Sequence, residues 1–158
     1  MKIVLLSFIF LFGFLNNNKP TFLNYSVKIE FNGKPASVDL ESHPKARTYR
    51  TRLREGQAKG PNFADHYTII IWGCGSQCQR FAIMNAIDGK VYFPHTNYST
   101  NGIKFRRDSN LLIIDPLDSA AVSDFHEYIP ENWITKFMKW DGKDLILIDT
   151  TRTITKIN

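Results

Sequence analysis

Two cysteines, Cys74 and Cys78, offer the most visible chemistry in this chain. They bracket Gly75-Ser76-Gln77 in the string WGCGSQC, with an apolar run on either side. A pair at this spacing could form a disulfide, bind a metal or act as a redox couple. In an exported chain the surroundings are oxidising, and a glycine-containing turn brings the two sulfurs within reach of each other. We therefore expect an internal disulfide that holds the shape of a turn.

Zinc coordination is an alternative role for the two cysteines, because His66 and His95 would complete a set of four ligands of suitable type. Structural zinc sites usually bring two close pairs of ligands, whereas these histidines stand alone, so we expect no metal site and no cofactor. A thioredoxin-like redox pair has two intervening residues rather than three. The papain-type signature is also a poor match, because Gln77 stands where its second cysteine belongs. The string assigns no catalytic residue.

The N-terminus predicts export. Lys2 precedes the apolar run Ile3–Leu15, and three asparagines follow it. This run of 13 residues is shorter than the roughly 20 that a membrane-spanning helix needs, and a basic residue before a short apolar core is typical of a signal peptide. We expect a signal peptide over 1–18 and one globular domain over 19–158, periplasmic or secreted, with no other stable membrane insertion. An uncleaved anchor is the alternative, because no Ala-x-Ala cleavage site is visible.

Positive charge is concentrated in one segment. The whole chain has 20 basic and 15 acidic residues, and six of the basic ones lie between Lys45 and Lys59, where Glu55 is the single acid. Ala46, Tyr49 and Leu53 follow the i, i+3, i+7 spacing of an amphipathic helix. Proline suits the first turn of such a helix, and the Gly-Pro pair after it ends it. The segment lacks the interleaved aromatic residues that stack on bases, so we do not expect a nucleic-acid partner.

Short β-branched and aromatic runs, separated by turn residues, predict strands after His66. Asp-Gly at 88–89 and at 141–142 is a strong hairpin signal. The expected strands are Tyr67–Trp72, Phe81–Ile87, Val91–Phe93, Ile103–Arg106, Leu111–Ile114, Ile134–Trp140 and Leu145–Ile148. The fold class is α+β, with one main helix packed on a mostly antiparallel meander sheet of about six to eight short strands.

Three further segments complete this prediction. Ser26–Phe31 reads as an early strand, and 116–130 reads as a long loop with one helical turn. The end of the chain, 150–158, alternates weakly and is predicted to add an edge strand or to fray. Thr68–Ile71 and Leu111–Ile114 lack polar alternation, which predicts central strands covered on both faces.

Three blocks of the sequence resemble a family of small exported bacterial proteins without an assigned activity. They are TRLREGQAKGPNFADHY, IIIWGCGSQCQRFAIMNAIDGKVYFP and GIKFRRDSNLLI, with KWDGKDLILI as a looser fourth. The resemblance covers about Arg52–Ile114 and implies export and a shared fold, but it brings no catalytic residues. Asp65 stands where the family pattern has glycine, which calls into question the backbone shape of the loop before His66.

The helix, the loop over 62–67 and the cysteine turn are close in sequence, so their polar side chains are predicted to converge on one surface. The candidate binding residues are Arg50, Arg54, Asn62, Asp65, His66, Gln77, Gln79 and Arg80. A structural alternative is that Asn62 and His66 only hold their loop in place by hydrogen bonds to backbone groups.

Two classes of function fit these features. The first is a binding or interaction module of the cell envelope, of the inhibitor or immunity type, which docks a protein partner through the cysteine turn and the basic helix. The second is a small envelope hydrolase with His66 as base and Arg80 or Arg54 as an anion clamp. No carboxylate or nucleophile can be paired with His66 from the sequence, so the first class is favoured. A concave pocket holding His66, Arg80 and a carboxylate would favour the second.

Overall fold

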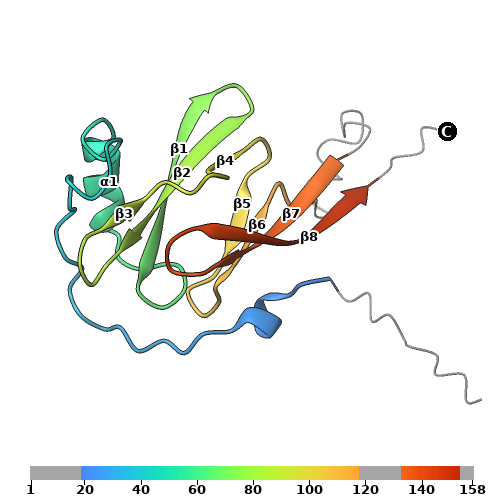
Figure 1. Ribbon diagram of the computed structural model, residues 1–158, viewed down its shortest axis with the longest axis horizontal. Helices are drawn as coiled ribbons and strands as arrows, with labels where there is room; N and C mark the ends of the chain where they lie inside the picture. Colours follow the sequence, from blue (N-terminus) through green and yellow to red (C-terminus); the bar gives the residue numbers. More distant parts are fainter. Residues whose placement is uncertain (1–18, 118–132, 154–158) are drawn as a thin grey trace, which may run out of the picture.

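The computed structural model describes residues 19–117 and 133–153, which form one α-helix and two antiparallel four-stranded sheets (Figure 1). The predicted α+β class is confirmed, and the six to eight expected strands number eight in this part of the chain. They divide between two sheets instead of forming one meander. The predicted signal peptide over 1–18, most of the loop over 116–130 and residues 154–158 lie outside the described residues.

The first sheet is built around one long hairpin. Its strands are β1 (Tyr67–Gly75), β2 (Cys78–Asn85), β3 (Val91–Tyr92) and β4 (Tyr98–Ser99). Both β3 and β4 pair with β2, so β1 is left at the edge of the sheet. The sequence predicted Thr68–Ile71 to be central. The segment is covered on both faces as far as Ile70, but its outer edge has no neighbouring strand in the described residues.

The second sheet confirms the hairpin predicted at Asp141-Gly142 and the strands predicted on either side of residues 107–110. Its strands, in spatial order, are β5 (Ile103–Phe105), β6 (Leu111–Ile114), β7 (Trp133–Trp140) and β8 (Leu145–Thr153). Residues 106–110 join β5 to β6, and Asp141-Gly142 opens the turn before β8, with Gly142 at φ +98°. Because β8 runs on to residue 153, the first part of the predicted C-terminal edge strand is confirmed.

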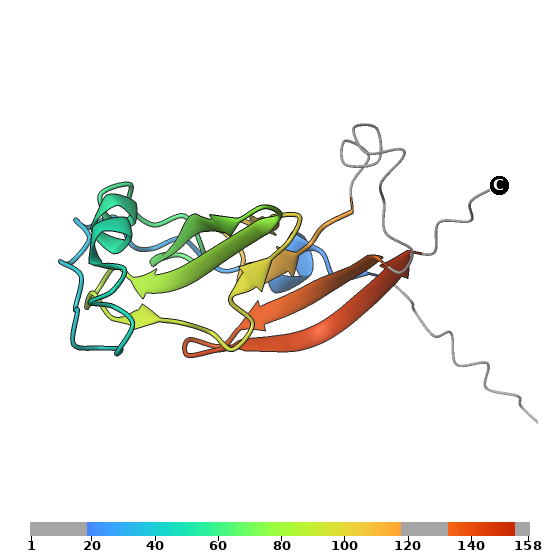
Figure 2. The same cartoon turned by 90° about the horizontal axis from the view of Figure 1, so that it is seen from above.

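Side chains on the two faces of the β1–β2 hairpin enter different cores, because successive strand residues point to opposite faces. Ile69, Phe81 and Ile83 pack against the second sheet. Ile70 and Ala82 belong to the other core, on the side of the helix. The protein therefore has three layers, in which the first sheet lies between the helix and the second sheet (Figure 2).

The helix is shorter than predicted. α1 spans Arg50–Gln57, whereas turns replace the expected first part of the helix from Lys45. The amide N–H of Ala46 donates to the carbonyl of His43, three residues earlier, which tightens the chain into turns before the α-helical pattern begins. The predicted apolar stripe is nonetheless confirmed, because Ala46 and Leu53 are fully buried and face the first sheet.

The predicted strand over Ser26–Phe31 is wrong. Only Ser26 forms a β-bridge, with Ser109. A 3-10 turn, η1 (Phe22–Tyr25), precedes it. The backbone N–H groups of Glu30 and Phe31 donate to a side-chain carboxylate instead of a neighbouring strand. Since their donors are satisfied in this way, the segment lies along the protein without joining a sheet.

Gly56 fixes how closely α1 approaches β1. A Cβ atom at this position would lie 2.4 Å from Cγ1 of Ile70. Replacing glycine by alanine inside a helix usually stabilises a protein by up to about 1 kcal/mol. Here we expect Gly56→Ala to lower the free energy of unfolding by about 1–2 kcal/mol, because overpacking outweighs that gain. Urea unfolding measures the change, and Thr51→Ala on the exposed side of α1 is the control, with a change below about 0.5 kcal/mol. A Gly56→Ala protein as stable as the wild type would contradict this packing.

Candidate functional site

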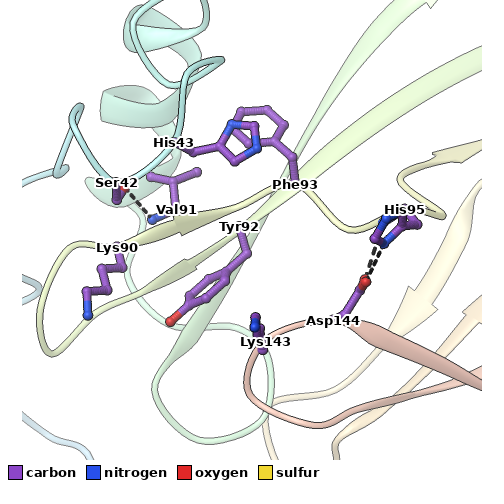
Figure 3. A pocket seen from close by; sticks show the side chains of 9 residues that line it. All are labelled: Ser42, His43, Lys90, Val91, Tyr92, Phe93, His95, Lys143 and Asp144. Atoms are coloured by element: carbon purple, nitrogen blue, oxygen red, sulfur yellow. Dashed lines mark hydrogen bonds and ion pairs between the residues drawn. The ribbon is translucent and has the colours of Figure 1, made fainter.

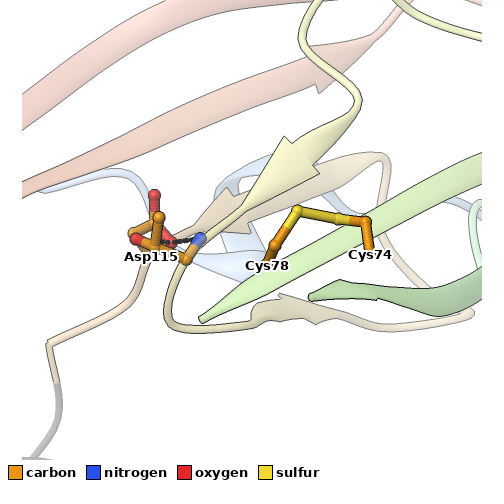
Figure 4. The surroundings of a disulfide bond; sticks show 4 residues. Cys74, Cys78 and Asp115 are labelled. Atoms are coloured by element: carbon orange, nitrogen blue, oxygen red, sulfur yellow. Dashed lines mark hydrogen bonds between the residues drawn. A yellow bond between two sulfur atoms is a disulfide. The ribbon is translucent and has the colours of Figure 1, made fainter. Parts of the chain in front are cut away.

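The cysteine turn is a covalently closed hairpin end. Ser76 and Gln77 connect β1 to β2, and the strand register shifts between Gly73 and Gly75, which makes Cys74 the extra residue of a β-bulge. The predicted disulfide between Cys74 and Cys78 is confirmed, with the two Cα atoms 5.1 Å apart (Figure 4). Closing so short a loop is worth only about 2 kcal/mol in the entropic account. The bridge therefore fixes the local shape of the turn more than it stabilises the fold.

The residues around this bridge form the tip of the hairpin, which we define as Gly73–Arg80. Most of it is exposed, including the side chains of Gln77, Gln79 and Arg80. Arg80 pairs across the sheet with Tyr98 on β4, whose side chain is 49% exposed. Figure 1 shows the β1–β2 hairpin extending beyond the other strands of its sheet. The structure thus brings three of the eight predicted residues together at an exposed, rigid end.

Asn62 has the structural role that the sequence left as the alternative. Its side-chain Oδ1 accepts a hydrogen bond from the amide of Ile69 at 2.7 Å, and its Nδ2 donates to the carbonyl of Ile69 at 3.1 Å. The amide side chain thereby occupies the place of a neighbouring strand for one residue of β1. We conclude that Asn62 fastens its loop to the edge of the sheet.

Asp65 adopts the left-handed backbone conformation that the glycine of the family pattern would favour, with φ +69°. Its Oδ1 accepts hydrogen bonds from the amides of Glu30, at 2.7 Å, and Phe31, at 2.8 Å. Its Oδ2 lies 3.0 Å from Nδ1 of His66. Partial burial acts to raise the pKa of this carboxyl, but the hydrogen bonds from Phe31, His66 and Glu30 outweigh it, and the pKa lies below its usual value.

Arg107 completes this network and was missed by the sequence reasoning. Its guanidinium donates from Nε to the carbonyl of Asp65 at 2.9 Å and from Nη2 to the carbonyl of Phe31. In return, the amide of Asp65 donates to the carbonyl of Arg107 at 2.7 Å. The partners are 42 and 76 residues apart in the chain, so no local pattern could have revealed the contact.

The structure does not bring the eight predicted residues to a single surface. His66 lies just before β1, at the base of the hairpin, whereas Arg80 pairs with Trp72 near the tip. Six residue steps along the strand separate these positions, which corresponds to roughly 20 Å. Arg50 and Arg54 lie on α1, and both are exposed. The anion clamp expected around His66 is therefore not formed with Arg80, and the role of these residues in binding stays a prediction.

A pocket of about 370 Å³ lies elsewhere, between β3 and the turn that joins β7 to β8. Figure 3 shows the side chains of Tyr92 and Phe93 on opposite sides of the chain, with His43 stacked against Phe93 at a ring distance of 4.6 Å. At its mouth, Nδ1 of His95 lies 2.5 Å from Oδ2 of Asp144. The complete lining is Ser42, His43, Lys90, Val91, Tyr92, Phe93, His95, Lys143 and Asp144.

The charges of this pocket suit an anion. Lys90 and Lys143 line it, and its carboxylate, Asp144, is hydrogen-bonded to His95. Partial burial acts to raise the pKa of Asp144, but the hydrogen bonds from the His95 ring and the backbone of Leu145 and His95 outweigh it, and the pKa is lowered. Burial and the nearby charge of Lys45 lower the pKa of His43. The sequence presents His95 as a solitary histidine and a weak candidate for a zinc ligand, because its partner Asp144 is 49 residues away.

Comparison of the chain with protein-family models, with curated proteins and with solved structures finds no match. The resemblance to small exported bacterial proteins therefore stays a prediction. Within residues 19–117 and 133–153, the structure contains no helix that is both long and apolar enough to span a membrane.

The contribution of Asp65 to the free energy of unfolding should depend on pH. Asp65→Ala removes the acceptor of two backbone amides and should lower the free energy of unfolding by about 2 kcal/mol. Asp65→Asn keeps Oδ1 as acceptor and tolerates the left-handed conformation, so its loss should be smaller.

Because the folded-state pKa of Asp65 is lowered, its charge contributes stability above the unfolded-state pKa, and this contribution is lost as the pH falls through the folded-state value. Asp65→Asn should therefore lose less stability than the wild type in that acidic range. Urea unfolding of both proteins across a pH series measures this, and parallel acid profiles would contradict it.

Proposed function

We propose that the protein is an exported binding module of the cell envelope, of the inhibitor or immunity type, which contacts a protein partner through the tip of the β1–β2 hairpin. The observation that carries this proposal is the combination of exposure and rigidity at Gly73–Arg80. The polar side chains of this tip are free of the core, while the disulfide and the strand pairing fix its backbone. A preorganised surface loses little conformational entropy on binding, which favours affinity.

The basic helix supports the same surface. Arg80 is directly opposite Trp72, so both side chains point to the same face of the sheet, and Trp72 packs in the core beneath α1. Arg50 and Arg54 are exposed on α1, the helix that covers the face of the sheet to which Arg80 belongs. A partner with acidic groups would find cations from two rigid elements there.

Export is supported by the N-terminal sequence pattern and by the disulfide, because such bridges persist in oxidising compartments.

The polar residues at the base of the hairpin are poor candidates for binding, which favours recognition at the tip. Asn62 and Asp65 already hydrogen-bond to backbone groups of the protein, so they have little capacity left for a ligand.

The test is affinity capture from envelope extracts of the source organism with matched variants of the tip. A specific protein partner should be retained by the wild type, and Arg80→Ala should weaken binding by about tenfold, the effect of losing roughly one charged hydrogen bond. The double variant Cys74→Ser/Cys78→Ser should stay folded and also bind more weakly. Lys139→Ala is the control, because Lys139 is an exposed cation on β7 of the other sheet. Equal retention by all four proteins would rule out the tip as the contact.

A hydrolase is the second candidate, and the His95–Asp144 pair is the observation that favours it. Asp144 accepts from the ring and from the amide of His95, which orients the imidazole and leaves Nε2 directed away from the carboxylate. Such a histidine can act as general base toward a water molecule, with Lys90 and Lys143 near an anionic substrate group. His66, the base predicted from the sequence, also pairs through Nδ1 with a carboxylate, that of Asp65, but it does not line the pocket that holds Lys90 and Lys143.

This second candidate predicts a specific pattern of activity. If the purified protein hydrolyses any of a panel of chromogenic esters and phosphate esters, His95→Ala should lower kcat/KM by at least about a hundredfold, the usual contribution of a general base. His66→Ala should leave kcat/KM unchanged. No turnover by the wild type, or loss of activity only in His66→Ala, would eliminate this site.

A further inference from the structure

The hydrogen bonds of Tyr67 and Ile69 show which backbone groups of β1 point away from β2. Tyr67 exchanges backbone hydrogen bonds with Phe63. The backbone N–H and C=O groups of Ile69 both hydrogen-bond to the side-chain amide of Asn62. Both residues therefore direct their N–H and C=O groups away from β2. Because this direction repeats every second residue, the backbone groups of Ile71 and Gly73 also point outward.

Nothing in residues 19–117 and 133–153 pairs with these outward groups of Ile71 and Gly73. The edge is thus closed up to Ile69 by the chain itself and open from Ile71 to the β-bulge at Cys74. Ile71 is also one of the exposed large apolar residues, with 41% of its surface accessible. An open edge of this kind is a template for an added strand.

A groove of about 310 Å³ runs along the same edge. Arg52 and Glu55 of α1, together with Lys59 just after the helix, line it on one side, and Phe105 lines it from β5 on the other. Arg52 and Glu55 form a loose surface pair at 3.7 Å, so the groove carries a net positive charge. The open backbone of Ile71 and the groove are therefore parts of one feature.

We propose that the edge of β1 over Ile71–Gly73 binds an extended, acidic segment of a protein partner by strand addition. The main chain of that segment hydrogen-bonds to Ile71 and Gly73. Its alternate side chains point to opposite faces, so acidic residues meet Arg52 and Lys59 while apolar residues meet Ile71 and Phe105. This inference rests on the proposed binding function and names the chemistry of the partner.

Charge decides between this occupant and a second copy of the chain. Two copies paired through β1 would place the Arg52 and Lys59 side chains of one copy near those of the other, and like charges at an interface are unfavourable. An acidic segment of another protein instead neutralises both cations.

The test uses the purified full chain and a displayed library of short random peptides. Selection should enrich peptides in which acidic and apolar residues alternate. One enriched peptide is then synthesised with N-methyl groups on its odd or on its even residues. Only one of these two series should lose affinity, by at least about tenfold, because only alternate amides face β1. Equal effects of both series would overturn strand addition.

Matched variants locate the site. Ile71→Lys should weaken peptide binding by about tenfold, since a lysine on the edge obstructs an added strand. Ile146→Lys is the control, because Ile146 is 49% exposed on β8, the edge strand of the other sheet. Thermal unfolding checks that both variants fold, and Arg52→Glu should reverse the preference for acidic peptides. Enrichment of non-acidic peptides, or equal binding by Ile71→Lys and wild type, would contradict the proposal.

Sedimentation of the wild type and Ile71→Lys completes the test. A dimer that is lost in Ile71→Lys would show that a second copy occupies the edge, which overturns the acidic partner. An envelope protein that depends on Arg80 but not on Ile71 would overturn strand addition while the proposed function stands. Without any Arg80-dependent partner, the proposed function itself fails.

Discussion

Ile69 and Ile70 are neighbours on β1, yet they enter different cores, because a strand sends successive side chains to opposite faces. One core joins the β1–β2 hairpin to the second sheet, and the other joins it to α1. A slip of one residue in the register of this hairpin would exchange the two apolar sets, so that each set would pack against the layer shaped for the other. The hairpin is therefore held firmly along its buried part, and its tip keeps a fixed position relative to the other layers.

The two ends of this hairpin differ in what their polar groups do. At the base, Asn62, Asp65 and Arg107 satisfy backbone groups of the protein and tie the N-terminal segment to the first sheet. At the tip, Gln77 and Arg80 are exposed and make no side-chain hydrogen bond within the described residues. Polar groups that are already satisfied gain little from a ligand, whereas exposed groups on a rigid backbone can recognise one.

Asp65 shows how a residue other than glycine can be accommodated in the left-handed backbone region. A non-glycine residue in the left-handed region costs about 1–2 kcal/mol, but aspartate is among the residues that tolerate it best. Its carboxylate then gains two backbone hydrogen bonds that glycine could not make, from Glu30 and Phe31. The strain and these contacts arise from the same residue, so the carboxylate that offsets the strain also anchors a distant segment.

Short-range spacing determined what the sequence could reveal by itself. The Cys74–Cys78 bridge, the Asp-Gly turns and the buried stripe of Ala46 and Leu53 depend on residues a few positions apart, whose geometry the local backbone sets. Tertiary structure decided the division into two sheets, the position of β1 at an edge and the pairing of His95 with Asp144. Tertiary structure also explains why Ser26–Phe31 is irregular and not a strand. The backbone N–H groups of its last two residues donate to the carboxylate of Asp65, about 35 residues away, and not to a neighbouring strand. Which edges and side chains meet across such separations depends on how the layers pack, and no local pattern encodes that.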